Sequence, residues 1–186
     1  MVFELIISIV LGFSLAAAAG FRIFIPLLLV SLAAHFGWFP IDQNWEWVGS
    51  NIALWILGIA AVFETFAYFI PWLDNLLDTI SVPLAGIAGT LLMVITMGDV
   101  DPIFTWVLAI IAGGGAAATI SGTAGVTRLT STATTGGVAN PVIASVETGA
   151  ATTISVASVF SPFLALILVL FIVWSIWRWI KKLRRS

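Results

Sequence analysis

The chain has 186 residues, of which 61% are hydrophobic and 9% are charged, and its formal net charge at pH 7 is −2. A soluble domain of this size has too little interior to bury so much apolar surface, so the composition excludes that class and indicates an integral membrane protein. The absence of cysteine excludes disulfides, thiolate metal sites and thiol nucleophiles.

Apolar stretches long enough to cross a bilayer recur along the chain, and helix start signals separate them. Asp101-Pro102, Asn140-Pro141 and Ser161-Pro162 each place a capping side chain before a proline, which is favoured at the first helical position. Ser81 with Pro83 is a looser version of the same signal. The pattern predicts an all-α polytopic bundle, residues 1–186 forming one membrane domain, with spans at about 5–36, 51–71, 81–98, 102–126, 141–160 and 162–180.

The first stretch, 5–36, is too long for one straight crossing. As a continuous helix it would measure about 48 Å, whereas the hydrocarbon core of a bilayer is about 30 Å thick. Gly20 and Pro26 lie on either side of Arg22 and are the natural break points. We therefore expect a broken helix near Arg22.

The segment "PWLDNLLDTI", at 71–80, has two faces at helical spacing. One face is apolar, and Asp74 and Asp78 lie together on the opposite face. This pattern predicts a short amphipathic helix in the cytoplasmic interface. Acids four residues apart can hold a divalent cation, but we interpret this pair as a solvated polar face.

The polar segment "TRLTSTATTGG", at 127–137, stands out in an apolar chain. We expect irregular backbone folded into the protein here, which membrane proteins tolerate only where protein or a water-filled cavity satisfies it. A plain cytoplasmic loop is the alternative. The expected break residues are Gly136 and Gly137, and the hydroxyl side chains expected to line a solute pathway are Thr130, Ser131, Thr132, Thr134 and Thr135.

Four charged residues away from the chain ends suggest an internal repeat. Arg22 and then Glu64 precede one proline-marked span, and Arg128 and then Glu147 precede another. The order divides the chain into repeat one at about 5–98 and repeat two at about 102–180, each with three spans. An odd number of spans inverts the second copy, as in many secondary transporters. Coincidence between similar apolar segments is the alternative.

Orientation follows from the basic tail. Five of the seven basic residues lie in the last nine positions, so the positive-inside rule places the tail, 181–186, in the cytoplasm. With six spans, the N-terminus is then expected to be cytoplasmic as well. The connection "GWFPIDQNWEWVGSN" would lie outside, where its tryptophans suit a membrane interface.

Three stretches, "LAAAAGFRIFIPLL", "IPWLDNLLD" and "RLTSTATTGGVANP", carry a family resemblance. Together they make the chain similar to the domain of unknown function 4126 family of small bacterial membrane proteins. The resemblance implies a helical fold in a bacterial cytoplasmic membrane, and it implies that Arg22, Glu64, Arg128 and Glu147 belong to the family pattern. The chain has "ASVET" where that pattern suggests an acidic pair, so Glu147 stands alone.

The chain lacks the residues that most catalytic mechanisms need. His35 is the only histidine and reads as an interfacial side chain. The glycines at 113–115 have no following lysine and suit close helix packing better than a phosphate loop. We expect no enzyme activity, and an intramembrane enzyme is the alternative. No metal site, cofactor or nucleic-acid partner is expected either.

The four buried charges carry the functional hypothesis. A charge at the bilayer centre costs at least about 2.5–3.5 kcal/mol on insertion scales, so four together need a reason. The first interpretation is a transporter or channel for a small polar or anionic solute, coupled to protons through a glutamate. The others are a protein that handles lipids or isoprenoids and a non-transporting scaffold with structural ion pairs. Membrane lipid is an expected partner, and a homo-oligomer is compatible with the pattern.

Overall fold

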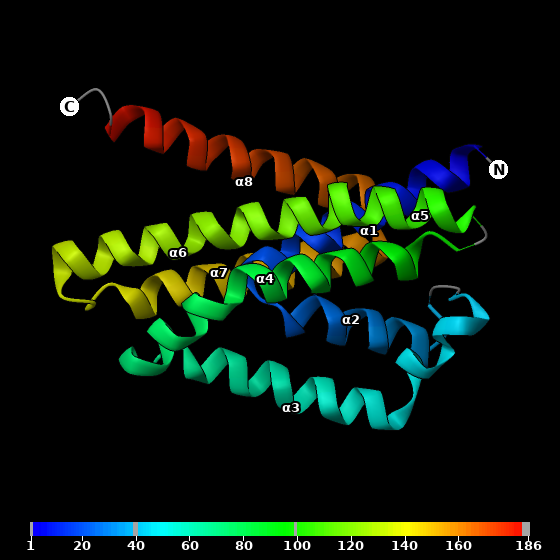
Figure 1. Cartoon of the computed structure of the whole chain (residues 1–186), viewed down its shortest axis with the longest axis horizontal. Helices are drawn as coiled ribbons and strands as arrows, with labels where there is room; N and C mark the ends of the chain where they lie inside the picture. Colours follow the sequence, from blue (N-terminus) through cyan, green and yellow to red (C-terminus); the bar gives the residue numbers. More distant parts are fainter. Residues whose placement is uncertain (1, 39–40, 99, 184–186) are drawn as a thin grey trace.

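The computed structural model describes residues 2–38, 41–98 and 100–183, and every regular element within these ranges is helical (Figure 1). Residues 184–186 of the predicted tail lie outside the described residues. The elements are α1 (Val2–Phe21), α2 (Phe24–His35), the 3-10 helix η1 (Gln43–Gly49), α3 (Asn51–Ala67), α4 (Pro71–Thr96), α5 (Pro102–Leu108), the π-helix η2 (Ala109–Gly114), α6 (Gly115–Thr135), α7 (Asn140–Phe160) and α8 (Pro162–Leu183).

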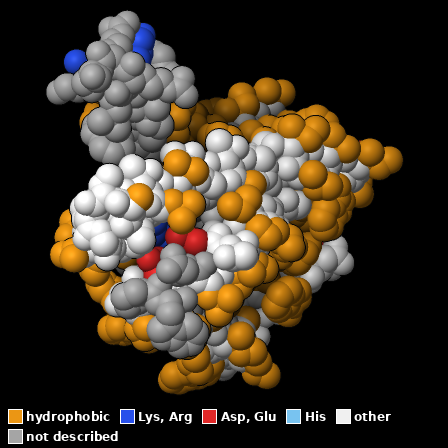
Figure 2. Space-filling model, turned by 60° about the vertical axis from the view of Figure 1, so that its left-hand side comes forward, with side chains coloured by type: hydrophobic (Ala, Val, Ile, Leu, Met, Phe, Trp, Pro, Cys, Tyr) orange, Lys and Arg blue, Asp and Glu red, His pale blue; other side chains and the backbone are white. Residues whose placement is uncertain are grey.

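Several helices are long and apolar enough to cross a membrane, as the composition predicted. Among the described residues there are four, or five if η1 and α3 form one bent span. The four are α1, Leu76–Thr96 of α4, the continuous stretch Pro102–Thr135, and α7. Large apolar side chains cover much of the outer surface, as an integral membrane protein requires (Figure 2). Six spans are not confirmed, because α2 and the apolar part of α8, Pro162–Ser175, are shorter.

The first predicted span breaks, as expected, near Arg22. Helix α1 ends at Phe21, and α2 begins at Phe24 and runs back toward the end where α1 starts (Figure 1). Pro26 lies in the first turn of α2, where the backbone N–H that proline lacks would have no partner within the helix. Gly20 has a different role from the one expected. A Cβ there would lie 2.6 Å from Ile120 and 2.7 Å from the carbonyl of Ala117, so Gly20 allows close packing against α6.

The separate interfacial helix predicted at 71–80 is wrong. Helix α4 runs without interruption from Pro71 to Thr96, through Ser81 and Pro83. The physical reason is the position of Asp74, which is 2% exposed instead of solvated. Its carboxylate faces the bundle, and ionic contacts with α6 hold the first turns of α4 in place. The helix start signal at Ser81 was therefore misleading.

The irregular segment predicted near Arg128 is also wrong for most of its length. Helix α6 continues through Arg128 to Thr135, and the chain leaves it only at Gly136 and Gly137, whose φ values are 65° and 85°. Threonine hydroxyls along α6 donate to carbonyls four residues earlier, so the helix satisfies its own polar groups. A helix can therefore hold this polar sequence without a water-filled cavity.

Small residues bring α4 close to η2, the use expected for the glycine run. A Cβ on Gly89 would lie 2.6 Å from the carbonyl oxygen of Gly113, and one on Gly114 would lie 3.0 Å from the carbonyl of Gly86. Such contacts allow the two backbones to approach, which is how helices associate in membranes.

The two ends of the described chain lie at opposite ends of the long axis. Helix α1 begins at the end where η1 lies, and α8 finishes at the end where α6 turns into α7 (Figure 1). The reversal at Arg22 accounts for this arrangement, since α1 and α2 form a hairpin and not one crossing. The expectation of two termini on one side is therefore not confirmed, and the inverted repeat stays a prediction.

Candidate functional site

Six charged side chains from five parts of the chain meet inside the bundle. We call them the charge cluster, and they are Arg22, Glu64, Asp74, Asp78, Arg128 and Glu147. Each is buried except Asp78, whose side chain is 14% exposed. The four charged residues that the sequence singled out are all brought together here, joined by the two aspartates of α4.

Arg22 lies at the break between α1 and α2 and is completely buried. Its Nη1 lies 3.1 Å from Oε2 of Glu147. Its Nε donates to the hydroxyl of Thr148 at 3.0 Å, and its Nη2 donates to the carbonyl of Ala144 at 2.9 Å. All these partners belong to α7, so Arg22 fixes the broken helix against that element.

Arg128 binds acids on both sides of it. Its Nη2 donates to Oε2 of Glu147 on α7 at 2.5 Å. Its Nη1 lies 3.3 Å from Oδ1 of Asp74 and also bonds Asp78, both on α4. One guanidinium thus joins α4, α6 and α7, and it shares the Oε2 atom of Glu147 with Arg22.

Tyr68 contributes an aromatic ring to the same site. The guanidinium carbons of Arg22 and Arg128 lie 3.9 Å and 4.1 Å from its ring centroid. The face of an aromatic ring attracts a cation through its quadrupole, and the attraction is stronger where both groups are desolvated. Tyr68 lies just after α3 and is 5% exposed, so the ring helps to hold the two like charges in one place.

Glu64 has a different function within the cluster. Its Oε1 accepts from the backbone N–H of Ile23 at 2.8 Å, and its Oε2 accepts from that of Phe24 at 3.0 Å. The N–H groups of a first helical turn have no partner within the helix and carry a partial positive charge. Glu64, on α3, therefore caps α2 and stabilises the break.

Asn140 connects the cluster to the turn after α6. Its Nδ2 donates to Oδ2 of Asp74 and to the hydroxyl of Thr132, both at 3.0 Å. The sequence suggested Asn140 as a helix cap, but α7 begins at Asn140 itself, with Ala139 in the cap position, and no side chain makes a capping bond there. Oδ1 of Asn140 and Nε of Arg128 are buried and have no hydrogen-bond partner among the described residues.

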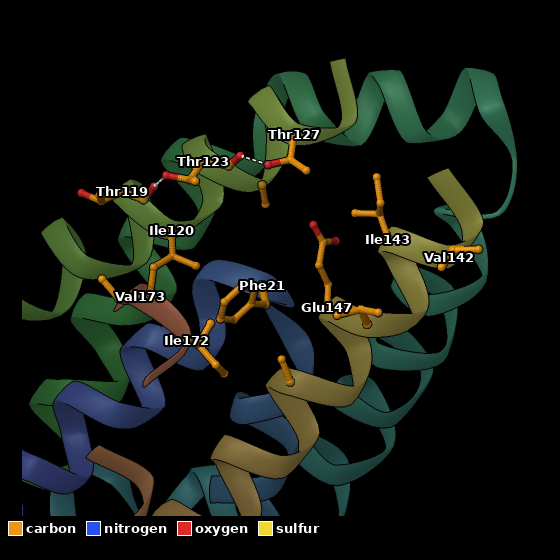
Figure 3. Close-up of a pocket in the computed structure, with 13 residues that line it drawn as sticks. Phe21, Thr119, Ile120, Thr123, Thr127, Val142, Ile143, Glu147, Ile172 and Val173 are labelled. Atoms are coloured by element: carbon orange, nitrogen blue, oxygen red, sulfur yellow. Dashed lines mark hydrogen bonds between the residues drawn. The ribbon is translucent and has the colours of Figure 1, made fainter. Parts of the chain in front are cut away.

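Two cavities reach the cluster. The end cavity, of about 290 Å³, is lined by Tyr68, Asp74, Thr132 and Asn140 together with the Gly136–Gly137 turn. Figure 2 looks toward this end and shows acidic side chains in a hollow of the surface. The lateral groove, of about 530 Å³, lies between α6 and α7 (Figure 3). Glu147 points into it. Since Arg128 binds both Glu147 and Asp74, it links the two cavities.

Most of the predicted hydroxyl lining lies elsewhere. Of the five candidates on α6, Thr132 contacts a side chain of the site, because its hydroxyl accepts from Asn140. Thr130 and Thr134 are exposed and bond their own helix. Ser131 and Thr135 bond each other and the turn that follows. The described site is therefore defined by charges and not by hydroxyl groups.

Sequence reasoning missed three members of the site. The sequence pattern of Asp74 and Asp78 indicated a solvated helix face, and no pattern predicted Tyr68 as part of the site. The available signal was the spacing of the two aspartates, which puts both carboxylates on one helical face directly before an apolar run. In a chain with so few charges, acids at the start of a span need buried partners.

The described part of the chain has no group of three or more His, Cys, Asp and Glu arranged to hold a metal ion. The four carboxylates are instead arranged around the two guanidinium groups and the first turn of α2. Proton uptake and the exchange of ionic partners are the chemistry that this arrangement permits.

Comparison with known proteins gives a family but no activity. Residues 9–182 match the family described as "Domain of unknown function (DUF4126)". The match covers nearly the whole chain, so the chain belongs to this family, as the sequence resemblance indicated. No curated protein and no solved structure matches the chain.

Proposed function

We propose that this member of the DUF4126 family is a membrane transporter whose buried charge cluster takes up a proton as it moves its solute. The observation that supports the proposal is the charge balance of the site. Four carboxylates lie around two guanidinium groups, and the cluster lies between a cavity at one end and a groove on the side.

The charge balance requires a further positive charge. With all six groups ionised, two positive charges face four negative ones, and only Glu64 gains compensation from a helix terminus. A buried charge without a partner is costly, so such a group takes a proton or a cation. Ion pairs that served stability alone would need no excess of acids. The cluster is therefore suited to binding and releasing a proton.

Arg128 provides the coupling. It holds Glu147, which lines the lateral groove, and Asp74, which lines the end cavity. A proton on Glu147 removes one ionic partner of Arg128, so the guanidinium shifts toward the aspartates of α4. Release of the proton reverses the shift. Protonation on one side of Arg128 thus changes the pairing on the other side.

The helix break between α1 and α2 provides an element that can move next to the Arg128–Glu147 pair. Discontinuous helices near a central site are a recurring feature of secondary transporters. Here Arg22 and Glu64 hold the two halves of the break, and both belong to the cluster. A change of pairing at Glu147 therefore acts directly on Arg22, which determines how α1 and α2 are held against α7.

The two aspartates of α4 change the expected charge of the solute. With Glu64 and Glu147 as the only acids the set is neutral, and the two arginines suggested a polar or anionic solute. Asp74 and Asp78 make the set negative, so a cation is the better candidate. We propose that the end cavity is the water-side entrance, on the cytoplasmic side with the basic tail. The N-terminus would then lie on the opposite side.

A lipid-handling protein is the second candidate, and the lateral groove favours it. Nine of the thirteen residues that line the groove are apolar, and several of them are exposed on the outer surface, where lipid would reach them. The two candidates differ in what they carry: the first moves a small solute together with a proton, and the second moves lipid between leaflets.

Flux in proteoliposomes tests the proposal. Purified protein is reconstituted with a pH-sensitive dye inside, and sodium, potassium or tetraphenylphosphonium is added outside in the presence of an outward proton gradient. We expect alkalinisation of the lumen with at least one cation and none with Arg128→Gln. Movement of labelled lipid without a pH change would favour the lipid candidate. Neither response from folded protein would contradict both.

A further inference from the structure

We propose that the lateral groove binds a hydrophobic organic cation, with its charge next to Glu147 and its apolar groups against the walls between α6 and α7. The inference names the solute class of the site described above and rests on the proposed function. It depends on three observations: the size and chemistry of the groove, the residue at its polar end, and the charges that lie behind that residue.

The groove fits an organic molecule better than a hydrated inorganic ion. Its volume of about 530 Å³ falls within the range of about 300–1,000 Å³ that is usual for small-molecule sites. Its three threonines, Thr119, Thr123 and Thr127, donate their hydroxyl hydrogens to carbonyls of their own helix. The apolar walls are Phe21, Ile120, Ala124, Val142, Ile143, Val146, Ala150, Ile172 and Val173. Among these lining side chains, Glu147 and the three threonine oxygens are the groups that could replace water around a metal ion, and the remaining nine are apolar.

The polar end of the groove is negative. Glu147 is the one charged residue that lines it within the described chain, and Figure 3 shows its carboxylate directed into the space between α6 and α7. Arg22 and Arg128 do not line the groove and are 0% and 3% exposed. An anion entering the groove would therefore meet a carboxylate first, without direct access to a guanidinium.

The residues behind Glu147 strengthen this preference. Both arginines are held on one oxygen of Glu147, and Arg128 also pairs with Asp74 and Asp78. The local charge thus stays negative when the arginines are included. A phospholipid has a phosphate group that this field would repel, so the groove favours a cation over a lipid headgroup.

A pair of ions of equal shape and opposite charge separates charge recognition from apolar binding. Tetraphenylphosphonium and tetraphenylborate have similar size and surface but opposite charge. Binding of each to the purified protein is measured by equilibrium dialysis in the absence of any gradient. We expect tetraphenylphosphonium to bind more tightly by about tenfold or more, a difference that apolar contacts alone cannot produce.

Three variants locate the binding site. Ala150→Trp fills the groove without changing any member of the charge cluster and should abolish binding of tetraphenylphosphonium. Glu147→Gln should weaken that binding by about tenfold, because it removes the carboxylate that faces the cation. Glu46→Gln, on the exposed surface of η1, removes one carboxylate at the other end of the molecule and should have no effect. Ala150→Trp keeps the test decisive if Glu147→Gln does not fold.

The outcomes distinguish this inference from the proposed function. Equal binding of the two ions, tighter binding of tetraphenylborate, or unchanged binding by Ala150→Trp would overturn the inference. Competition by phosphatidylglycerol with no preference for the cation would also overturn it, in favour of lipid. Coupled flux of sodium without binding of tetraphenylphosphonium would leave the transporter proposal intact and reject only this solute class. Selective binding of tetraphenylphosphonium without proton movement would support this inference and contradict the proton-coupled transporter.

Discussion

Nη1 of Arg22 and Nη2 of Arg128 lie 3.1 Å and 2.5 Å from the same carboxylate oxygen, Oε2 of Glu147, although one arginine lies at a helix break and the other within a continuous helix. Two like charges at one acceptor repel each other, and the surrounding acids and the Tyr68 ring offset the repulsion. The arrangement depends on every partner being present.

The break near Arg22 depends on Glu64. Glu64→Gln retains one oxygen acceptor and replaces the other with an amide donor, which faces the N–H of Ile23 or Phe24. We expect a loss of about 0.5–2 kcal/mol, the usual cost of losing a helix cap. Hydrogen exchange should quicken at the first turn of α2 and not in α7. The control is Glu46→Gln, and equal protection in both variants would show that the cap contributes nothing.

Close packing of α4 on η2 depends on Gly89. A Cβ there would lie 2.6 Å from the backbone of Gly113, which cannot move aside as a flexible side chain can. Gly89→Ala should cost about 1–3 kcal/mol, as overpacking usually does. The control is Gly58→Ala in α3, where a Cβ would have no neighbour within 4 Å. Thermal unfolding in detergent measures both, and a similar melting temperature for the two variants would contradict the packing argument.

The hairpin of α1 and α2 makes a prediction about topology. The chain has no native cysteine, so single cysteines can be placed at Val2, Asn44 and Thr134. With the long axis across the membrane, the start of α1, which contains Val2, and η1, which contains Asn44, lie on one side (Figure 1). The end of α6, which contains Thr134, lies on the other. An impermeant thiol reagent applied to intact cells should label the first two alike. Labelling of Val2 together with Thr134 would restore the six-span topology.

The hydroxyl groups of α6 should differ in importance. Thr132 accepts from Asn140, which in turn donates to Asp74, so Thr132→Val leaves part of the site without its hydrogen bond. Thr134 bonds its own helix and is exposed. We expect Thr132→Val to reduce proton-coupled flux and Thr134→Val to leave it unchanged. A similar loss in both variants would support the hydroxyl-lined pathway that the sequence suggested.

The sequence predicted the membrane class, the break near Arg22 and the four charges that meet. Each of these predictions follows from a simple physical requirement. Long apolar runs require a bilayer, and isolated charges within such runs require buried partners of opposite charge. The sequence did not predict that α6 stays helical past Arg128. Polar composition suggested irregular backbone, but threonines can satisfy themselves within a helix, so composition alone does not separate the two cases.

The aspartates of α4 show a second limit. Asp74 and Asp78 have the spacing of a polar helix face, and a polar face can point to water or to a buried cation with the same sequence. Only the position of Arg128, 50 residues or more further along the chain, decides between the two. Long-range pairing of this kind is absent from any local pattern. The Pro83 signal was misleading for a related reason, because tertiary contacts outweighed a local break.

The central ion pair yields the prediction that best separates function from structure. Arg128→Gln leaves Asp74 and Asp78 without their cation and Glu147 with Arg22 alone, and breaking a buried pair from one side costs about 3–5 kcal/mol. Glu147→Gln in the same chain removes one of the four acids that then face a single arginine, so the double variant should be more stable than Arg128→Gln alone. Thermal unfolding of the four proteins in a double-mutant cycle measures the coupling between the two residues.

Flux in the same four proteins then separates the interpretations. If the pair works as a proton-linked switch, the double variant recovers stability but not proton-coupled flux, because neither the acceptor nor the responding cation remains. Glu147→Gln alone should chiefly change the pH dependence of flux. If the pair is structural, activity should follow stability and return in the double variant. Recovery of both properties together would therefore remove Arg128 and Glu147 from the transport mechanism.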